Sequence, residues 1–455
     1  MSRDARVVLG AADPKPRGTW LDTWTPEDPQ FWASQGSRVA WSTLIITTVS
    51  LVLAFGTWFM VSALVVRLPA IGFQLSTTQL FWLAAMPGLA GGSLRILHTF
   101  LVPIYGTRHV VSISTLLLLV PALGWAVAVQ HIGTPYWVLM LLAFTAGFGG
   151  GNFSSFMPST SLFFPKRKQG TALAVQAGIG NLGVSITQFV TPWIVGFGIF
   201  AFLGRPQTFT RGGVSQDIWL QNAAYWYIPL ILVFGVAGWF LLKSVPVRAN
   251  FREQFDIFKD KHTWFMTSLY IMTFGTFSGA SASFPLLIKE LYTVLPGGPD
   301  PLTYAFIGPL IGSLSRVAAG PLSDRFGGGI LTVISGLGLL GCAVGVTFFT
   351  SPESMAEFPY FLTVMLALFF FSGVGNASTF RQMPLCFPPR QAGGVIGWTA
   401  AVAAYGPFFF SVIIGTLIAK MGSPNLFFFG LAAFCLANVA ICWWYYTRPG
   451  AEKPS

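Results

Sequence analysis

The sequence predicts an all-α membrane protein with twelve transmembrane helices arranged in two pseudo-symmetric six-helix bundles. The 455 residues are 53% hydrophobic and only 9% charged, with a mean hydropathy of +0.66, whereas soluble domains are about 25% charged. Apolar segments of about 20 residues, enough to cross the hydrocarbon core, recur twelve times. The longest charged connection, Lys243 to Thr263, leaves six of them on each side.

Breaks with charges, prolines and Asn/Asp clusters separate the predicted spans in chain order. Their centres lie near Leu53, Ala90, Leu118, Thr145, Gly183, Phe234, Gly275, Gly312, Leu337, Ala367, Ala404 and Cys435. We therefore expect an N-terminal tail (1–40), a first bundle (41–243), a linker (244–263), a second bundle (264–446) and a C-terminal tail (447–455). The segment 20–32, WLDTWTPEDPQFW, suits an interfacial collar before the first span.

Positive charge is distributed unequally between the two sides of the predicted membrane. Alternating the sides from a cytoplasmic N-terminus puts nineteen of the 26 Lys and Arg inside and five outside, and the remaining two lie within spans. This asymmetry satisfies the positive-inside rule. It predicts a multi-pass protein of the cell inner membrane with both termini in the cytoplasm.

Several other function classes are disfavoured by composition. The formal charge of +11 is dispersed over short loops instead of forming one basic domain, so no nucleic acid partner is expected. The four cysteines have no metal-ligand spacing, and the spans hold no carboxylate pair or nucleophile with a base. We expect neither an enzyme nor a metal or other cofactor, and a monomer in the lipid bilayer.

Two arginines lie inside apolar spans that contain no Asp or Glu. Arg95 follows GGSL and Arg316 follows GSLS, and a glycine stands eleven residues after each of them, at Gly106 and Gly327. Both arginines thus occupy the second span of their half at matching depth. Parallel repeats of this kind place a substrate site near the membrane midplane, between the halves.

The chemistry of the two arginines predicts a small anionic substrate. Arg at a helix centre costs roughly 2.5 to 3.5 kcal/mol on insertion scales, so two without buried carboxylates imply an anion from solution. The planar guanidinium fork favours a planar oxyanion with delocalised charge over a compact halide. The alternative is that each arginine snorkels or bonds backbone carbonyls.

Two spans are rich in small residues. The fifth contains GIGNLG, with Gly178, Gly180, Gly183 and Asn181, and the eleventh contains Gly393, Gly394, Gly397 and Gly406. No strand precedes GIGNLG, so it is not read as a dinucleotide loop. Such residues let membrane helices approach closely. Packing alone is one interpretation, and the other places bare backbone and the Asn181 amide at the substrate path.

Aromatic and polar candidates accompany the arginines. Asn152 and Phe153 follow three glycines in the fourth span, and Phe380 follows GNAST in the tenth, so a ring from each half can sandwich a flat anion. Tyr270 and Phe274 lie one turn apart in the seventh span. His98, on the same face as Arg95, is the one titratable candidate for proton coupling, and a neutral, hydrogen-bonded histidine is the alternative.

The stretches GGSLR, GFGGGNFSS, FFPKRKQGTALAVQAGIGNLGVS, YIMTFGTFSG and FIGPLIGSLSRVAAGPLSDRFGG resemble the NarK-type nitrate/nitrite porters of the major facilitator superfamily. GIGNLG looks like the first nitrate signature of that family. The resemblance implies that Arg95 and Arg316 ligate nitrate or nitrite, that Asn181 and Tyr270 add hydrogen bonds, and that Phe153, Phe274 and Phe380 wall the site. The chain departs from the second signature, where Ala403, Ala404 and Tyr405 replace expected glycines.

The resemblance and the residues together predict a nitrate/nitrite transporter that works by alternating access. We expect exchange, because an empty carrier with two uncompensated positive charges should cross over more slowly than a loaded one. The alternatives are proton-coupled nitrate symport, with His98 or water carrying the proton, and a non-transporting anion sensor.

Overall fold

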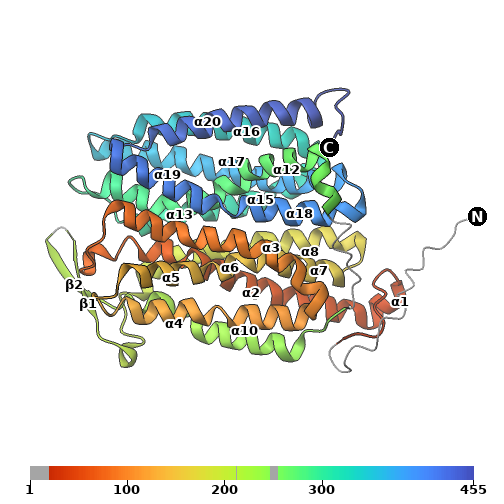
Figure 1. The fold of residues 1–455 in the computed structure, drawn as a ribbon, viewed down its shortest axis with the longest axis horizontal. Coiled ribbons are helices and arrows are strands. Elements are labelled where there is room, and N and C mark those ends of the chain that lie inside the picture. The colour runs from red at the N-terminus through yellow and green to blue at the C-terminus, as the bar shows by residue number, and fades with distance from the viewer. Residues whose placement is uncertain (1–19, 212, 246–254) are drawn as a thin grey trace, which may run out of the picture.

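The computed structural model describes residues 20–211, 213–245 and 255–455, and these form one long helical bundle (Figure 1). The first nineteen residues of the expected N-terminal tail and residues 246–254 of the expected linker lie outside the described residues. A short two-stranded hairpin marks one end of the bundle, hereafter the hairpin end. Trp20 and Ser455 lie at the opposite end, hereafter the tail end.

Helices account for most of the described chain. The first half contains α1 (Pro29–Phe31), α2 (Ser37–Leu64), α3 (Thr77–Leu116), α4 (Leu119–Ala128), α5 (Tyr136–Ala146), α6 (Phe148–Gly151), α7 (Phe153–Phe163), α8 (Lys166–Ile194), α9 (Asn222–Tyr225) and α10 (Tyr227–Leu241). The second contains α12 (Lys261–Tyr270), α13 (Thr276–Ile288), α14 (Pro301–Ala305), α15 (Ile307–Phe326), α16 (Gly328–Val346), α17 (Phe358–Cys386), α18 (Pro389–Ala403), α19 (Gly406–Met421) and α20 (Asn425–Cys442).

Short 3₁₀ and π segments and one hairpin complete the fold. The 3₁₀ helices are η2 (Pro69–Ile71), η3 (Ala201–Leu203), η4 (Phe255–Lys259), η7 (Thr347–Phe349) and η8 (Met355–Glu357), and the π segments are η1 (Trp32–Gly36), η5 (Ile271–Gly275), η6 (Lys289–Thr293) and η9 (Trp443–Thr447). Strands β1 (Gln207–Arg211) and β2 (Val214–Ile218) pair antiparallel.

Eleven helical segments of the described chain are long and apolar enough to span a membrane. One of them, Thr77–Ala128, has 52 residues, and at about 1.5 Å per residue it is far longer than the roughly 30 Å hydrocarbon core. Gly106 interrupts it with φ 79° and ψ 158°. We interpret this segment as two of the twelve expected crossings, with the chain reversing at Gly106.

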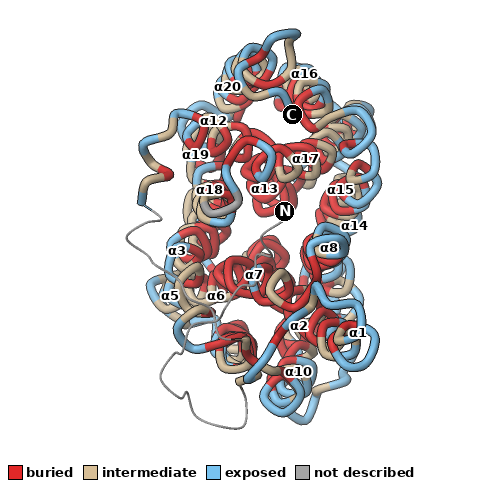
Figure 2. Tube along the Cα trace, turned by 90° about the vertical axis from the view of Figure 1, so that its right-hand side faces the viewer, coloured by how far each residue is buried: buried red, intermediate tan, exposed pale blue. Residues whose placement is uncertain are grey.

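The helices form two groups that face each other across the centre of the bundle. Figure 2 shows α2, α3, α7, α8 and α10 in one group and α12, α13, α15, α17 and α20 in the other, with buried residues facing inward. The internal repeat is visible in the backbone, because Gly106 and Gly327 both have positive φ, at 79° and 90°. Each glycine reverses the chain eleven residues after the arginine of its half.

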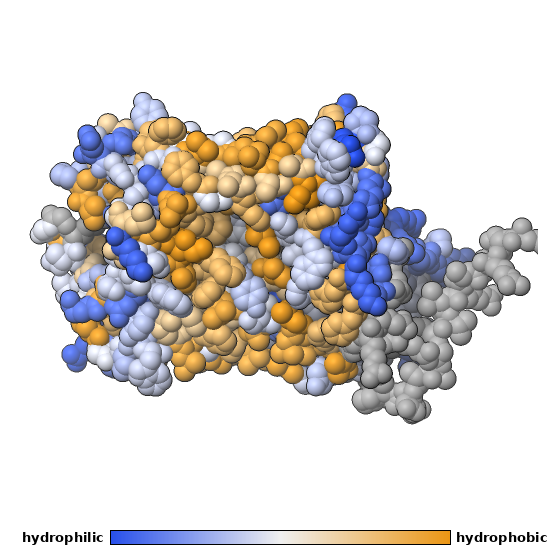
Figure 3. Space-filling view, turned by 45° about the horizontal axis from the view of Figure 1, so that its top comes forward, coloured by the Kyte–Doolittle hydropathy of each residue, from blue (hydrophilic) through white to orange (hydrophobic). Residues whose placement is uncertain are grey.

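The surface separates into zones, as expected of a membrane protein. On the face drawn in Figure 3, hydrophobic residues form a broad band across the middle, and hydrophilic residues gather toward the two ends. All four cysteines are buried and free, consistent with a packing role.

The tryptophan-rich segment 20–32, expected as an interfacial collar, packs on the protein through Trp24. Trp24 is 9% exposed, lies edge-to-face against Phe163, and its Nε1 donates to the carbonyl of Leu162. The carboxylate of Glu27 accepts a 2.9 Å bond from the backbone N–H of Lys166, at the first turn of α8. The segment is therefore fastened to the tail end of the first half.

Several polar contacts join the two halves at the hairpin end. Arg67 Nη2 lies 2.6 Å from Asp300 Oδ2, with side chains 9% and 20% exposed. Thr77 Oγ1 donates to Glu290 Oε2 in the first turn of η6 over 2.8 Å. Deeper in the bundle, Gln188 Nε2 donates to the carbonyl of Ser281 over 2.9 Å. These links close the bundle at that end.

Candidate functional site

Arg95 and Arg316 lie deep inside the bundle, one in each half. Arg95 is in the middle of the first crossing of α3 and is 0% exposed, and Arg316 in α15 is 6% exposed. Neither forms an ion pair with a carboxylate of the described residues. Because an isolated buried charge is costly, this arrangement needs compensation from other groups.

Backbone carbonyls hold part of the Arg95 guanidinium. Its Nε donates to the carbonyl of Gly150 and its Nη1 to the carbonyl of Ala400, both over 2.8 Å. Ala400 lies in α18, so the second bond joins the two halves. The remaining Nη2 is buried and has no partner within the described chain, and the same is true of Nη1 of Arg316. At least one terminal nitrogen of each guanidinium thus remains available to an anion.

Aromatic rings lie against both guanidinium groups, three at Arg95 and one at Arg316. The guanidinium carbon of Arg95 lies 4.7 Å from the ring centroid of Phe153, 5.1 Å from that of Phe274 and 5.3 Å from that of Trp58. That of Arg316 lies 5.5 Å from the centroid of Phe380. Cation–π attraction strengthens when water is excluded, so the rings stabilise the charges.

Phe153 and Phe380 meet instead of standing apart as parallel walls. Their centroids are 6.4 Å apart at an interplanar angle of 83°, an edge-to-face contact between the halves. Tyr270 stacks on Phe274 at 5.4 Å and 8° and also contacts Phe380 at 5.7 Å. The predicted aromatic residues are therefore brought together.

A π-helical turn sets the direction of Tyr270 and Phe274. The π segment η5 follows Tyr270 directly and contains Phe274. Such local irregularities are frequent at functional sites. Tyr270 is 0% exposed and its hydroxyl has no partner among the described residues, so it offers one further donor beside the arginines.

Two buried amides lack partners for both of their polar atoms: Asn181 in α8 and Asn376 in α17. Both are 0% exposed. Among the described residues, no other Asn or Gln has both amide atoms buried without a hydrogen bond. Buried polar groups are normally satisfied, so these two amides call for a further partner.

Asn152 and His98 are engaged elsewhere. Asn152 is buried and its Nδ2 donates to the carbonyl of Ser114 over 3.4 Å, in the second crossing of α3. The ring Nδ1 of His98 lies 2.9 Å from Ser155 Oγ, as in the hydrogen-bonded alternative. The structure thus shows no contact of either side chain with Arg316, Tyr270 or Asn181.

The glycines of α8, α18 and α19 differ in what they approach. A Cβ at Gly183 would overlap the carbonyl of Val52 in α2, and one at Gly406 would overlap the carbonyl of Gly275. Those two glycines therefore allow close packing within each half. Across the halves, Gly178 faces Val317 and Gly397 faces Thr99. Gly180 meets Leu51, Gly394 meets Ile257, and Gly393 has open space around it.

Tyr405, which stands where the second nitrate signature would have glycine, fits into the structure because Gly92 faces its ring. A Cβ at Gly92 would lie 2.6 Å from the Tyr405 ring, and the Tyr405 hydroxyl is 2.8 Å from Ser93 Oγ. Gly92 and Ser93 lie just before Arg95 in α3. The missing side chain at Gly92 thus makes room for the added ring, and a hydrogen bond joins the halves there.

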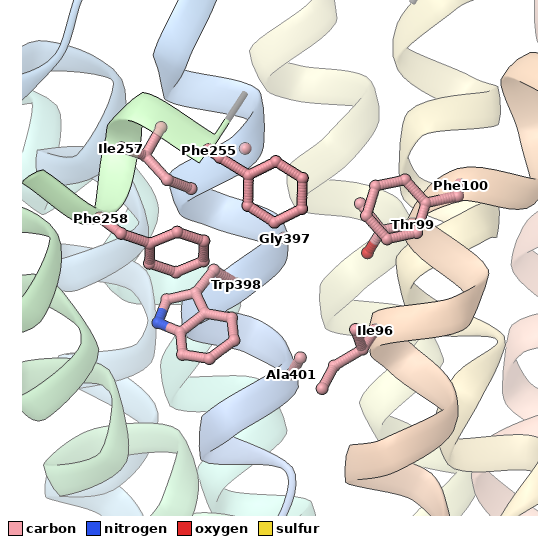
Figure 4. Close-up of a pocket in the computed structure, with 10 residues that line it drawn as sticks. Ile96, Thr99, Phe100, Phe255, Ile257, Phe258, Gly397, Trp398 and Ala401 are labelled. Carbon is pink, nitrogen blue, oxygen red and sulfur yellow. The ribbon is translucent and has the colours of Figure 1, made fainter. Parts of the chain in front are cut away.

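A cavity of roughly 170 Å³ lies between α3 and α18 on the tail-end side of Arg95. Figure 4 shows Phe255, Phe258 and Trp398 on one side of it and Ile96, Thr99 and Phe100 on the other. All of its lining except Thr99 is apolar or glycine. Its lining includes neither arginine and neither unpartnered amide, and it lies between residues of the two halves.

Sequence reasoning missed four groups: two carbonyls and one ring at Arg95, and one unpartnered amide in α17. The carbonyls of Gly150 and Ala400 carry no signal in side-chain chemistry. Trp58 is one of 16 tryptophans, and its part in the Arg95 cage depends on the packing of α2 against α3. Asn376 lies in the tenth span, four residues before Phe380, as Asn152 lies next to Phe153 in the fourth. A count of the polar residues inside the spans would have included it.

Comparison with known proteins agrees with this geometry. The family model described as Major Facilitator Superfamily matches residues 46–395. Two solved transporters share the fold: the xylose transporter XylE from E. coli in an inward open conformation (TM-score 0.63, 14% identity, 89% of this chain and 96% of that chain), and a bacterial homologue of the lysosomal transporter Spinster in an inward-facing, occupied conformation (0.62, 14%, 89% and 94%).

Several curated proteins are much more similar to this chain in sequence than these solved structures are. The chain is 64% identical over 440 residues to a Thermus thermophilus protein named probable nitrate/nitrite antiporter NarK2, covering 96% of this chain and 99% of the relative. It is 37% identical to the nitrate/nitrite transporter NarU of Salmonella typhimurium (95% and 97% covered) and 34% identical to NarU of Escherichia coli (94% and 96%). The chain is a multi-pass transporter, not an enzyme, and it belongs to the nitrate/nitrite porter family of the major facilitator superfamily.

Proposed function

We propose that this protein exchanges nitrate for nitrite across the cell inner membrane, through one central site between Arg95 and Arg316. The observation that carries the proposal is the pair of buried guanidinium groups without a carboxylate partner in the described chain. The nitrate/nitrite function of the relatives NarK2 and NarU supports the choice of anion.

The donors around the rings suit a small planar oxyanion. Arg95 Nη2, Arg316 Nη1 and the Tyr270 hydroxyl are buried and unpartnered, and the Asn181 amide adds another donor. At about 4 Å from each guanidinium, the Coulomb attraction of a single negative charge is roughly 4 kcal/mol per arginine at an effective dielectric of 20, before desolvation. This favours binding that is firm and still reversible.

Exchange follows from the cost of moving the site while it is empty. Without the anion, two positive charges remain in a low-dielectric interior. The barrier to the change between the outward-facing and inward-facing states should therefore be higher for the empty protein than for the anion-bound protein. Proton symport needs a titratable group near the anion, and His98, the one histidine near Arg95 among the described residues, is hydrogen-bonded to Ser155. The geometry therefore favours antiport.

The excess of Lys and Arg in the loops of the tail end favours the cytoplasm for that side. The hairpin end would then face outward, where Arg67–Asp300 and Thr77–Glu290 join the halves. Together with the cavity on the tail-end side, these contacts favour an inward-facing state of the alternating-access cycle.

The deciding experiment is nitrate uptake into proteoliposomes that contain the full-length protein. Vesicles are loaded with nitrite, with nitrate or with neither, and each set is tested with and without an imposed proton gradient. We expect uptake only with an internal anion and no response to the gradient. Gradient-driven uptake into anion-free vesicles would overturn exchange and establish symport, and binding without any flux would identify an anion sensor.

A further inference from the structure

Asn376 is a buried amide in the second half that no contact of the described chain explains. It lies in α17, is 0% exposed, and both its Oδ1 and Nδ2 are without a partner. The structural asparagines behave differently: Nδ2 of Asn438 donates to Phe434 within its own helix, and Nδ2 of Asn222 donates to Phe197. An amide that only served packing would be expected to find a similar bond.

The register of α17 against the seventh span places Asn376 level with Phe274. The two helical segments run antiparallel, Tyr270 contacts Phe380 at 5.7 Å, and Thr273 Oγ1 lies 3.3 Å from Thr379 Oγ1. Phe274 is four residues beyond Tyr270, and Asn376 is four residues before Phe380. Both steps are about one helical turn in the same direction, so Asn376 reaches the depth of the ring against which Arg95 lies.

The contact of α17 with α15 leads to the same depth from the other side. Gly373 packs directly on the carbonyl of Gly312, where a Cβ would overlap it. These helices run in the same direction, and Arg316 follows Gly312 by four residues. Asn376, three residues after Gly373, is therefore beside the level of Arg316.

The face of α17 that carries Asn376 points toward the centre. Positions seven before and four after it, Phe369 and Phe380, share its side of the helix. Phe369 contacts Phe277 at 6.1 Å, and Phe380 contacts Phe153 of the other half at 6.4 Å. Asn376 thus stands in the aromatic face that borders the arginine site.

We propose that Asn376 is an anion-binding residue whose Nδ2 donates a hydrogen bond to an oxygen of the transported anion. This inference rests on the proposed function of the same site. Each half then supplies one arginine and one carboxamide, with Asn181 from the first half and Asn376 from the second. The short amide adds a donor without adding charge, so binding is strengthened while release remains possible.

The test replaces Asn376 with leucine, which has a similar volume and no polar atoms. Removing an unpartnered buried amide should leave the melting temperature of the anion-free protein unchanged or raise it. A lost hydrogen bond to a charged ligand should weaken nitrate binding by about tenfold or more. We expect a higher KM for nitrate in nitrite-loaded proteoliposomes and a smaller nitrate-induced rise in melting temperature.

Asn438→Leu serves as the matched control, because Asn438 is an equally buried asparagine of the same half, outside the site. Its anion-free melting temperature should fall and its nitrate KM should stay near that of the wild type. Asn376→Ala is tested in parallel. Nitrate KM unchanged in both Asn376 variants, or failure of both to fold, would overturn the inference by giving the amide a structural role. If the wild-type protein itself neither binds nor exchanges nitrate, the proposed function fails instead.

Discussion

Phe153 and Phe380, one from each half of the bundle, meet edge to face with ring centroids 6.4 Å apart. Each ring also lies against an arginine of its own half, Arg95 at 4.7 Å and Arg316 at 5.5 Å from the ring centroids. The two guanidinium groups are therefore connected through an aromatic contact that crosses the central interface. Movement of one half against the other must change this contact.

Arg95→Lys and Arg316→Lys should each reduce the rate of nitrate exchange by about tenfold to a hundredfold. Lysine keeps the charge but cannot reproduce the planar fork of donors, and a charge-assisted hydrogen bond contributes about 1.5 to 3 kcal/mol. Exchange is measured in proteoliposomes, with protein insertion quantified separately. Arg448→Lys is the control, because Arg448 is half-buried at the tail end, where it stacks on Trp444, away from the proposed site. Near-normal flux in the Arg95 or Arg316 variant would count against the site.

Gly92→Ala should destabilise the protein by roughly 1 to 3 kcal/mol through overpacking. The added methyl group would lie 2.6 Å from the Tyr405 ring. The double variant Gly92→Ala/Tyr405→Ala should regain most of the lost stability, because the ring is then absent. Thermal unfolding in detergent measures all three. Equal damage in the single and double variants would show that the two residues do not compensate each other.

Arg67→Ala should open the hairpin end more often. The Arg67–Asp300 pair is largely buried, and each 1.4 kcal/mol lost from the closed state raises the open population about tenfold. A cysteine at Ser62, which is 2% exposed in α2, reports opening through its reaction with a membrane-impermeant thiol reagent. Arg381→Ala, which breaks the Arg381–Asp324 pair within the second half, should leave the labelling rate unchanged. Similar rates in both variants would refute the assignment.

His98→Ala should retain nitrate/nitrite exchange and its indifference to a proton gradient. The imidazole bonds Ser155 within the first half, so its loss should cost stability of about 0.5 to 1.5 kcal/mol, the worth of one hydrogen bond. Flux is compared with and without a pH gradient, beside the matched variant Ser155→Ala. A proton-coupled flux in the wild type that disappears in His98→Ala would place the histidine in the transport mechanism.

The spans, the repeat and the arginine pair were predictable because each depends on a local property. Apolar length identifies the crossings, and the eleven-residue spacing from Arg95 to Gly106 and from Arg316 to Gly327 identifies the repeat. One boundary was harder to predict, because the chain reverses at Gly106 itself and no loop separates the two crossings.

Side-chain direction and contacts between distant spans were less accessible. Asn152 was expected to face the anion, but its amide turns to the carbonyl of Ser114, and a neighbouring position on a helix points about 100° away. From the sequence, Tyr405 was interpreted as the loss of a glycine in the eleventh span. In the structure its ring fits because Gly92, in another span, leaves room for it. Pairing of this kind can be seen only when the helices are placed side by side.

The two arginines are alike in sequence and unequal in stiffness. Two N–H groups of Arg95 are tied to carbonyls of Gly150 and Ala400, while Arg316 makes no hydrogen bond within the described chain and rests on Phe380. If the halves rock against each other, we expect the tied Arg95 guanidinium to keep its place and the untied Arg316 guanidinium to change its orientation. The two arginines of the repeat would then play unequal parts in transport.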